Sequence, residues 1–400
     1  MQVLFVAPYV PSLIRVRPFQ FIRELANQGH QVTLLAAATR GSDAESSAIR
    51  AYTSRLEVVR ISLAAALRSC LGAALRGDPL QAAVSQAPEL DERLHLLLAQ
   101  DRFDIVHIEH LRAARLVRLL PPHLARLYDA VDSISLLLRR TLRASHSLRQ
   151  RAIAVLELQR TRAFEGRILA GFDETIVTSP DDAEVLCGLA PTASLRVVPN
   201  GVDQVYFQPL AEPREPATLV FSGKMSYHAN ATAVLDFVRS IFPLIRAARP
   251  DVRLTIVGSS PPPEVRQLAQ DPAITVTGLV ADLRPYVGRA TVAVCPMVVK
   301  VGIQNKLLEA MAMATPTVAT RIGAVGLSAR HGQDLLVADD ARQFAEHVCG
   351  LLADPVWAAS VGRAGRAYVQ QHHSWKRATE TLVILYAQAR EKRAKLVRSS

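Results

Sequence analysis

Cysteine and aromatic residues are scarce in this chain, and their scarcity excludes several classes of protein. The four cysteines, at positions 70, 187, 295 and 349, are spread over 400 residues. None of them forms the C-x-x-C pair typical of a local metal site, and four cysteines in a chain of this length do not make a disulfide scaffold. We therefore expect free thiols in a reducing compartment. With 5% aromatic but 50% hydrophobic residues, the core must be mainly aliphatic.

A long hydrophobic run is also absent. No uncharged apolar stretch reaches the roughly 18 residues that a transmembrane helix requires. The N-terminal MQVLFVAPYV has no basic residue before its short apolar run, and Pro8 and Pro11 interrupt it. These features argue against a secretion signal and against a membrane span. The sequence therefore predicts a cytoplasmic protein.

The length of the chain predicts two domains, because 400 residues exceed the roughly 250 to 300 at which one hydrophobic core stops growing. The excess of 47 basic over 36 acidic residues is unevenly distributed. Between positions 111 and 170, twelve arginines accompany only four acidic residues, Asp129, Asp132, Glu157 and Glu165. A stretch of this charge can face nucleic acid, an anionic bilayer or only solvent.

Short apolar strands alternate with helical patterns along the whole chain, which indicates parallel sheets with crossover helices. The first series of strands is expected at 2–7, 31–36, 56–61, 104–109, 125–130, 173–178 and 195–198. After the proline-containing AEPREPAT (211–218), a second series follows as TLVFSG, VRLTIVG, ITVTG, TVAVCP, TPTVAT and DLLVAD. We predict two doubly wound domains, 1–200 and 201–370, and a C-terminal helix at 371–400 that packs back toward the first domain. Ligands of such sheets bind beyond the carboxyl ends of the strands.

The segment VGIQNKLLEAMAMATPTVAT (301–320) predicts a helix that begins after a glycine-containing loop. Gly302 supplies the flexible entry and Asn305 can cap the first turn. The amide groups and dipole at such a helix start suit a phosphate. Lys306 can neutralise that phosphate while Glu309 accepts hydrogen bonds from a ribose. The alternative is a capped amphipathic helix with a Lys–Glu pair on its surface.

Polar residues also follow two strands of the first domain. His107, Glu109 and His110 end FDIVHIEH, and strand alternation places His107 and Glu109 on one face. Asp129 and Asp132 end the next strand. Asp132 can cap the following helix, whereas Asp129 can contact an acceptor hydroxyl. A structural role for the histidines remains open.

Arg15 and Arg17 precede Pro18 at the start of another expected helix. Because arginine binds phosphate bidentately, they can address a diphosphate donor or a phosphate-bearing lipid acceptor. They can equally form a solvated helix start.

Several of these segments resemble the retaining GT-B glycosyltransferases, in particular the large family-four group. The 301–320 segment looks like the donor-binding helix of that family, and VVPNGVDQVYF (197–207), FSGKMSYHAN (221–230) and VTGLVADLRPYVGRATVAVCP (276–296) are similar to its interdomain, first C-terminal strand and base-binding segments. IRVRPFQFIRELANQGH and YDAVDSIS are closer to the sugar transferases of bacterial exopolysaccharide clusters. The resemblance implies a GT-B fold, in which two Rossmann-like domains face each other across a cleft.

The resemblance also implies roles for individual residues. Glu309 matches the second glutamate of the family motif, which holds the ribose hydroxyls, whereas the position of the first glutamate is Val301. Sugar recognition is then expected from Gln304 and the backbone amides of 302–305, or else the transferred sugar has fewer hydroxyls to bind. The expected catalytic residues are His107, Glu109 and Gln304. The expected donor-binding residues are Gly223, Lys224, Gly258, Gly278, Leu279, Gly302, Ile303, Asn305, Lys306 and Glu309, and the expected acceptor-binding residues are Arg15, Arg17 and Asp129.

The implied activity is retaining transfer of a sugar from a nucleotide diphosphate-sugar to a glycan or lipid-linked acceptor, in bacterial surface polysaccharide synthesis. No cofactor and no metal are expected, because the chain has no D-x-D and no group with metal-ligand spacing. A catalytically silent GT-B scaffold, suggested by Val301, and a sugar-nucleotide epimerase are the alternatives. Nucleic acid is not an expected partner, since only Tyr128 and Phe164 lie among the arginines to stack bases.

Residues 133–170 combine apolar positions at helical intervals with arginines, the pattern of a basic amphipathic helix. This segment predicts a peripheral location at the inner face of the plasma membrane, on an anionic surface. The competing interpretation is that its apolar face packs on the domain's own sheet and the arginines meet only water.

Overall fold

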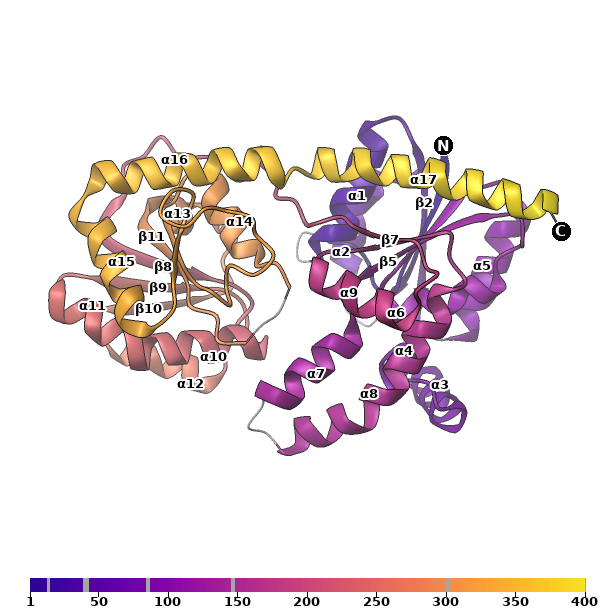
Figure 1. Ribbon diagram of the computed structural model, residues 1–400, viewed down its shortest axis with the longest axis horizontal. Helices are drawn as coiled ribbons and strands as arrows, with labels where there is room; N and C mark the ends of the chain where they lie inside the picture. Colours follow the sequence, from indigo (N-terminus) through magenta and orange to yellow (C-terminus); the bar gives the residue numbers. More distant parts are fainter. Residues whose placement is uncertain (13–14, 39–42, 84–86, 145–147, 300–301, 400) are drawn as a thin grey trace. The chain divides into compact units, whose positions relative to one another are not determined.

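The computed structural model describes residues 1–12, 15–38, 43–83, 87–144, 148–299 and 302–399. The chain separates into two compact units, Met1–Pro199 with Trp375–Ser400, and Asn200–Ser374. Each unit is a parallel sheet covered by helices on both faces (Figure 1). The predicted α/β fold class is thereby confirmed.

The sheet of the first unit has seven strands in the order β3-β2-β1-β4-β5-β6-β7, and every pair is parallel. The strands are β1 (Gln2–Ala7), β2 (Gln31–Ala38), β3 (Arg55–Arg60), β4 (Ile105–Glu109), β5 (Ala125–Val131), β6 (Glu174–Val177) and β7 (Leu195–Val197). The central strand β1 is apolar and buried at Val3–Ala7, as expected for a strand covered on both faces. Apolar runs of this kind made the positions of the strands predictable.

Two apolar layers cover this sheet. One contains α1 (Val16–Asn27) and α17 (Trp375–Ser399), and the other contains α6 (His110–Ala113), α8 (Leu148–Leu169) and α9 (Pro180–Leu189). The remaining helical segments are α2 (Asp43–Arg50), α3 (Leu63–Arg76), α4 (Leu80–Ala83), α5 (Pro88–Gln100), η1 (Ala114–Leu119) and α7 (Ile134–Ala144).

The second unit has six parallel strands in the order β10-β9-β8-β11-β12-β13. They are β8 (Glu215–Ser222), β9 (Arg253–Val257), β10 (Ile274–Gly278), β11 (Ala290–Cys295), β12 (Thr317–Thr320) and β13 (Leu336–Ala338). β8 begins at Glu215, earlier than the predicted TLVFSG. The early start contains Pro216 and a register irregularity against β11, with Ala217 at φ 50°, and such bulges admit a proline in a strand.

Helices of the second unit also form two layers. The first consists of α10 (His228–Asp236), the π-helical η2 (Phe237–Ile241), α11 (Phe242–Ala248), α12 (Pro263–Gln267), η3 (Leu268–Gln270) and α15 (Ala341–Ala353). The second consists of α13 (Arg284–Arg289), α14 (Asn305–Ala312) and α16 (Pro355–His372). In this layer α14 packs on β11 and β12, so its N-terminus lies near the carboxyl ends of those strands.

The C-terminal helix α17 belongs to the first unit and packs against α1, β5 and β6. Trp375 and Tyr386 are buried in the core that it shares with α1. Polar contacts extend along the same helix, with Arg393 2.6 Å from Asp173 and Lys392 bound to Glu174. Residues 371–374, expected within this terminal segment, are part of the second unit.

Residues 133–170 form two helices, α7 and α8, rather than one. The apolar side of α7 is buried at Ile134, Leu136 and Leu138, and Arg140 pairs with Asp181 at 2.6 Å. The expected apolar face therefore packs in large part on its own unit. Side chains that stay exposed on the two helices include Leu137, Ile153, Val155 and Leu156.

Candidate functional site

Two glycines shape the carboxyl edge of the second sheet. Gly223 follows β8 with φ 152°, and Gly258 follows β9 with φ 153°. A Cβ at Gly258 would lie 1.7 Å from the Gly223 carbonyl oxygen, and one at Gly223 would lie 2.8 Å from Asn230 Nδ2. Only glycine fits such close backbone approaches. Both positions therefore require glycine, because the protein's own atoms fill the space that a side chain would take.

The helix α14 begins beside this edge without a capping side chain. Its N-cap residue is Gln304, not Asn305, and no side-chain hydrogen bond caps the first turn within the described residues. Gln304 Nε2 instead donates to the Gly302 carbonyl at 2.8 Å. The prediction that Asn305 caps is therefore wrong, because this residue is already the first helical position and its side chain accepts from Asn200 at 3.5 Å. The Leu307 amide donates to the Gln304 carbonyl at 3.0 Å and, among the described residues, the amides of the two residues before Leu307 are left for another acceptor.

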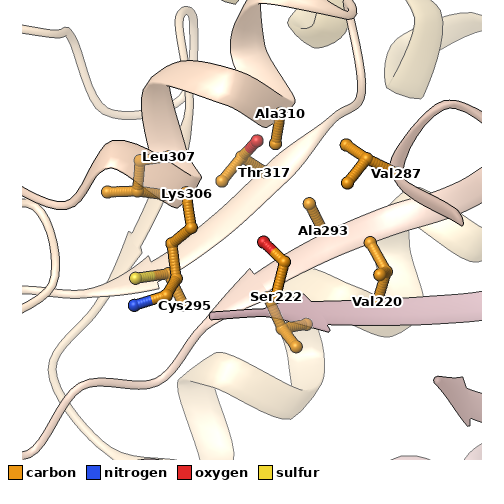
Figure 2. A pocket seen from close by; sticks show the side chains of 10 residues that line it. Val220, Ser222, Val287, Ala293, Cys295, Lys306, Leu307, Ala310 and Thr317 are labelled. Carbon is orange, nitrogen blue, oxygen red and sulfur yellow. The ribbon is translucent and has the colours of Figure 1, made fainter. Parts of the chain in front are cut away.

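Lys306 points inward from α14 toward the ends of β8 and β11 (Figure 2). Its Nζ donates to Asn230 Oδ1 at 2.8 Å and to Gln304 Oε1 at 3.0 Å, and lies 5.2 Å from the Phe221 ring centroid. Burial lowers the pKa of Lys306 below its ordinary value. Neither acceptor carries a charge, so the ammonium group makes no ion pair beside the glycine edge and Glu309 acts on it only at a distance. The alternative of a Lys306–Glu309 surface pair is wrong for the described residues.

A small cavity lies behind Lys306. Its volume is about 10 Å³, about enough for one water molecule. It is lined by Val220, Ser222, Val287, Ala293, Val294, Cys295, Lys306, Leu307, Ala310 and Thr317. Burial raises the pKa of Cys295 to about 11, so this thiol stays protonated. The cavity is too small for any ligand larger than a water molecule.

Glu309 lies one turn into α14. Its side chain is partly buried and makes no hydrogen bond or ion pair with any part of the chain that the structure describes. Burial raises the pKa of Glu309 to about 7, and the charge of Lys306 only partly opposes this shift. A half-buried carboxylate with free oxygens can accept hydrogen bonds from two adjacent hydroxyls.

The other predicted donor residues take different positions. Lys224 is exposed, while its carbonyl accepts from Asn230 Nδ2 at 3.0 Å. Gly278 ends β10 at φ 70° and accepts from the Gly258 amide, and the next side chain, Leu279, is 78% exposed. Ile303 is nearly buried. Val301 lies outside the described residues.

In the first unit, His107, Glu109 and Asp129 form a buried polar cluster at the ends of β4 and β5. Glu109 is the direct cross-strand neighbour of Asp129. All three side chains are at most 1% exposed. His107 and Glu109 share one face, as alternation predicts. His110 does not join them, since it adopts φ 66°, begins α6 and accepts from the Arg112 amide.

Arg17 is the cation of this cluster. Its Nε donates to Asp129 Oδ2 at 2.6 Å, and Nη1 donates to the Val198 carbonyl at 3.0 Å. Burial raises the pKa of Asp129, and Arg17 opposes the shift. Arg17 is therefore not a solvated helix start, whereas Arg15 is exposed and covers the Tyr9 ring with its Cζ 4.4 Å from the centroid.

Two tyrosines that the sequence did not single out complete the cluster. Tyr386 Oη is hydrogen-bonded to His107 Nδ1 at 2.7 Å, and Tyr9 Oη donates to Glu109 Oε1 at the same distance. Burial, with a smaller contribution from Arg17, lowers the pKa of His107, and burial together with Asp129 raises the pKa of Glu109 to about 8. At neutral pH the histidine is uncharged and the glutamate holds a proton.

Asp132 has a different role from the expected cap. Its Oδ1 accepts from the Thr178 hydroxyl at 3.0 Å. The start of α7 is instead served by Ser133, which accepts from the Leu136 amide, and by Glu165, which accepts from the Ile134 amide at 2.7 Å. The Glu165 carboxylate of α8 thus accepts the hydrogen bond that local spacing suggested for Asp132.

Within the described residues, no three His, Cys, Asp or Glu side chains are grouped so that they could hold a metal ion. No helix in that part of the chain is both long and apolar enough to cross a membrane.

Family models match both units. A model described as Glycosyltransferase Family 4 matches residues 16–205, and one described as Glycosyl transferases group 1 matches residues 216–354. Alpha-maltose-1-phosphate synthase from Mycobacterium tuberculosis is 33% identical over 219 residues, which cover 48% of this chain and 56% of that protein. The chain thus spans about half the length of the curated relatives it matches.

Solved structures resemble the whole chain. Sucrose-phosphate synthase from Thermosynechococcus elongatus has a TM-score of 0.71 at 18% identity, with full coverage of both chains. HepE from Anabaena, solved in complex with UDP, has a TM-score of 0.68 at 11% identity, covering 97% of this chain and 100% of that one. At such identities the likeness establishes a shared fold.

Proposed function

The chain belongs to the GT-B glycosyltransferases of group 1 and family 4, and on this premise we propose that it transfers a sugar from a nucleotide diphosphate-sugar to a glycan or lipid-linked acceptor. The observation that carries the proposal is the edge of the second sheet. There, Lys306 extends from the uncapped start of α14 to within 3.3 Å of the position that a Cβ would take at Gly223. Glu309, which makes no hydrogen bond within the described residues, follows in the next turn of the same helix.

Each of these groups suits one part of the donor. The Glu309 carboxylate accepts hydrogen bonds from the ribose hydroxyls. The diphosphate lies against the main chain at Gly223 and Gly258, where Lys306, the exposed Lys224 and the α14 dipole stabilise the charge of the leaving group. Gln304 and the 302–305 backbone contact the sugar. Because these residues supply the positive charge themselves, the transfer is proposed to need no metal.

The first unit is proposed to bind the acceptor. The exposed Arg15 addresses an acceptor phosphate, while Arg17 and Asp129 hold the loop and helix behind it through their buried pair. His107 and Glu109 belong to the same cluster, and we assign them to the reaction centre on the basis of the family resemblance.

Retention of configuration follows the same resemblance. The bond from the anomeric carbon to the diphosphate breaks, the acceptor oxygen attacks on the same face, and its proton passes to the leaving phosphate oxygen. The likeness of 14–30 and 128–135 to exopolysaccharide-cluster enzymes supports a role in bacterial surface polysaccharide synthesis. A lipid-linked acceptor would place the protein at the inner face of the plasma membrane, with the arginines of 133–170 toward the bilayer.

Titration of nucleoside diphosphates at several pH values tests the donor site. Because a protonated carboxyl accepts hydrogen bonds from ribose hydroxyls more weakly than a carboxylate does, affinity should fall by at most about tenfold per unit as the pH drops below about 7, and then level off. Glu309→Gln should remove this dependence and weaken binding at pH 8 by about 10- to 100-fold, the loss of a charge-assisted hydrogen bond of about 1.5 to 3 kcal/mol. Glu346→Gln, on an exposed glutamate of α15, is the matched control.

A donor and acceptor screen then tests the transfer itself. Turnover with at least one nucleotide-sugar is expected. Nucleotide binding without turnover for every pair would favour a catalytically silent scaffold, and interconversion of free sugar nucleotides without acceptor would favour an epimerase. Unchanged affinity of Glu309→Gln would remove this residue from the donor site.

A further inference from the structure

The helix α3 exposes three leucines on one side. Leu67, Leu71 and Leu75 are 65%, 66% and 83% exposed, and their spacing of four places them in one row along the helix. Single exposed leucines are common, but several in a continuous row form an apolar patch of the kind that contacts a protein or a membrane. The sequence did not distinguish this row from an ordinary core-facing stripe, because the spacing is the same.

α3 is attached to the first unit by its other side and its C-terminal end. Ala73 is fully buried, and Asp78, just after the helix, pairs with Arg167 of α8 at 2.9 Å. The Leu80 amide donates to Glu157 of α8 at 2.7 Å. These contacts keep α3 beside α8, and both project from the same side of this unit (Figure 1). The exposed Ile153, Val155 and Leu156 of α8 extend the apolar surface.

The charges around the leucine row have one sign. α3 contains Arg68 and Arg76 and no acidic residue. In α8 both acidic residues, Glu157 and Glu165, are buried and bind main-chain amides. The exposed charged side chains of α3 and α8 within the described residues are therefore all arginines. An apolar row surrounded by cations matches an anionic bilayer surface, whereas pairing with a second copy would bring arginines together.

We propose that α3 inserts its row of Leu67, Leu71 and Leu75 into the surface of an anionic bilayer, with the arginines of α3, α7 and α8 on the lipid phosphates. The inference rests on the proposed function in one respect, since it brings the acceptor-binding unit to the bilayer that holds a lipid-linked acceptor. It differs from the sequence-based expectation, because the inserted residues come from α3 rather than from 133–170. Apolar contact and charge attraction together give reversible binding without a membrane span.

Co-sedimentation with vesicles tests the proposal. The full chain should bind vesicles of phosphatidylglycerol and phosphatidylcholine at low salt, bind pure phosphatidylcholine weakly, and dissociate as salt rises. Leu67→Ser, Leu71→Ser and Leu75→Ser combined should lower the partition coefficient by about tenfold or more. Arg68→Glu with Arg151→Glu should also lower it. The matched control combines Leu244→Ser, Val356→Ser and Leu396→Ser, which are exposed elsewhere in the chain, and should bind as the unchanged protein does.

A second measurement does not depend on loss of binding. In Leu71→Trp, the emission of the introduced tryptophan should shift to shorter wavelength when anionic vesicles are added, and should not shift with neutral vesicles. Binding of the triple-serine variant equal to that of the unchanged chain, or an absent shift, would overturn the proposal. A lipid-free dimer that the triple-serine variant loses would assign the row to a second copy instead.

Nucleoside diphosphate affinity is measured in parallel to separate this inference from the proposed function. The triple-serine variant should retain it, since α3 and the donor residues belong to different units. Vesicle binding without nucleotide binding would contradict the proposed function alone. Nucleotide binding and turnover without vesicle binding would contradict this inference alone.

Discussion

Tyr386 Oη and His107 Nδ1 lie 2.7 Å apart, although 279 positions separate the two residues in the chain. The contact forms because α17 returns to the first unit and covers the ends of β4 and β5. The histidine ring is stacked on Phe5 at 4.1 Å, and its Nε2 lies 3.9 Å from Asp129 Oδ2. The C-terminal helix thus orients a side chain of the candidate reaction centre.

Tyr386→Phe should therefore destabilise the protein. The substitution leaves His107 Nδ1 buried without its partner, at a cost of about 1 to 3 kcal/mol in the free energy of unfolding. Urea denaturation measures the loss. Tyr206→Phe removes the hydroxyl of an exposed tyrosine, 3.2 Å from Asp282, and should change stability by less than about 1 kcal/mol. Equal stability of the two variants would contradict a structural role for the Tyr386 hydroxyl.

Glu109 should make stability fall as the pH rises. The pKa of Glu109 is about 8 in the folded protein and near 4.5 when unfolded. Between these values the folded state holds a proton that the unfolded state has lost, so stability decreases by up to about 1.4 kcal/mol per pH unit and levels off above pH 8. Burial and Asp129 produce the shift, against Tyr9, Arg17 and Arg15.

Glu109→Gln isolates this effect from other titrating groups. The amide mimics the protonated acid, keeps an acceptor for Tyr9, and should be more stable than glutamate at pH 8 but not at pH 4.5. Thermal unfolding across this range, compared between the two proteins, measures the difference. Parallel curves would show that Glu109 ionises normally.

Gly258→Ala should abolish nucleotide binding and destabilise the second unit. Its Cβ would lie 1.7 Å from the Gly223 carbonyl oxygen at a φ of 153°, which forces the two strand ends apart at a cost of several kcal/mol. Gly188→Ala is the control. No atom lies within 4 Å of its Cβ, so alanine there should stabilise α9 by about 0.5 to 1 kcal/mol. Normal nucleotide affinity in Gly258→Ala would contradict the proposed edge.

Lys306→Met should weaken nucleoside diphosphate binding while it leaves the stability of the protein nearly unchanged. Methionine fills the same buried space and removes the cost of burying a charge, which offsets the loss of the hydrogen bonds to Asn230 and Gln304, so the fold should remain. Affinity for a nucleoside diphosphate should drop by about 10- to 100-fold, while affinity for the free nucleoside should change little. Calorimetric titration with both ligands measures the contrast. Lys376→Met, on an exposed lysine of α17, should affect neither ligand.

The amino-acid sequence determined the two sheets and the order of their elements. Apolar runs such as VLFVA and TLVFS, bounded by glycine or proline, leave few alternatives to buried parallel strands. The segment around Glu309 likewise predicted a helix after a glycine-containing loop, and α14 confirms that helix.

Only the tertiary structure decided which polar groups meet. Spacing suggested caps at Asn305 and Asp132 and a surface pair at Lys306. Among the described residues no side chain caps α14. Glu165 of α8 accepts at the start of α7 and Asn230 of α10 accepts from Lys306, because neighbouring elements bring them there. Tyr386 contacts His107 because α17 returns to the first unit. The leucine row of α3 stays exposed, although its spacing equals that of a buried stripe. Local pattern determines what an element can be, while burial and long-range contact depend on what packs against it.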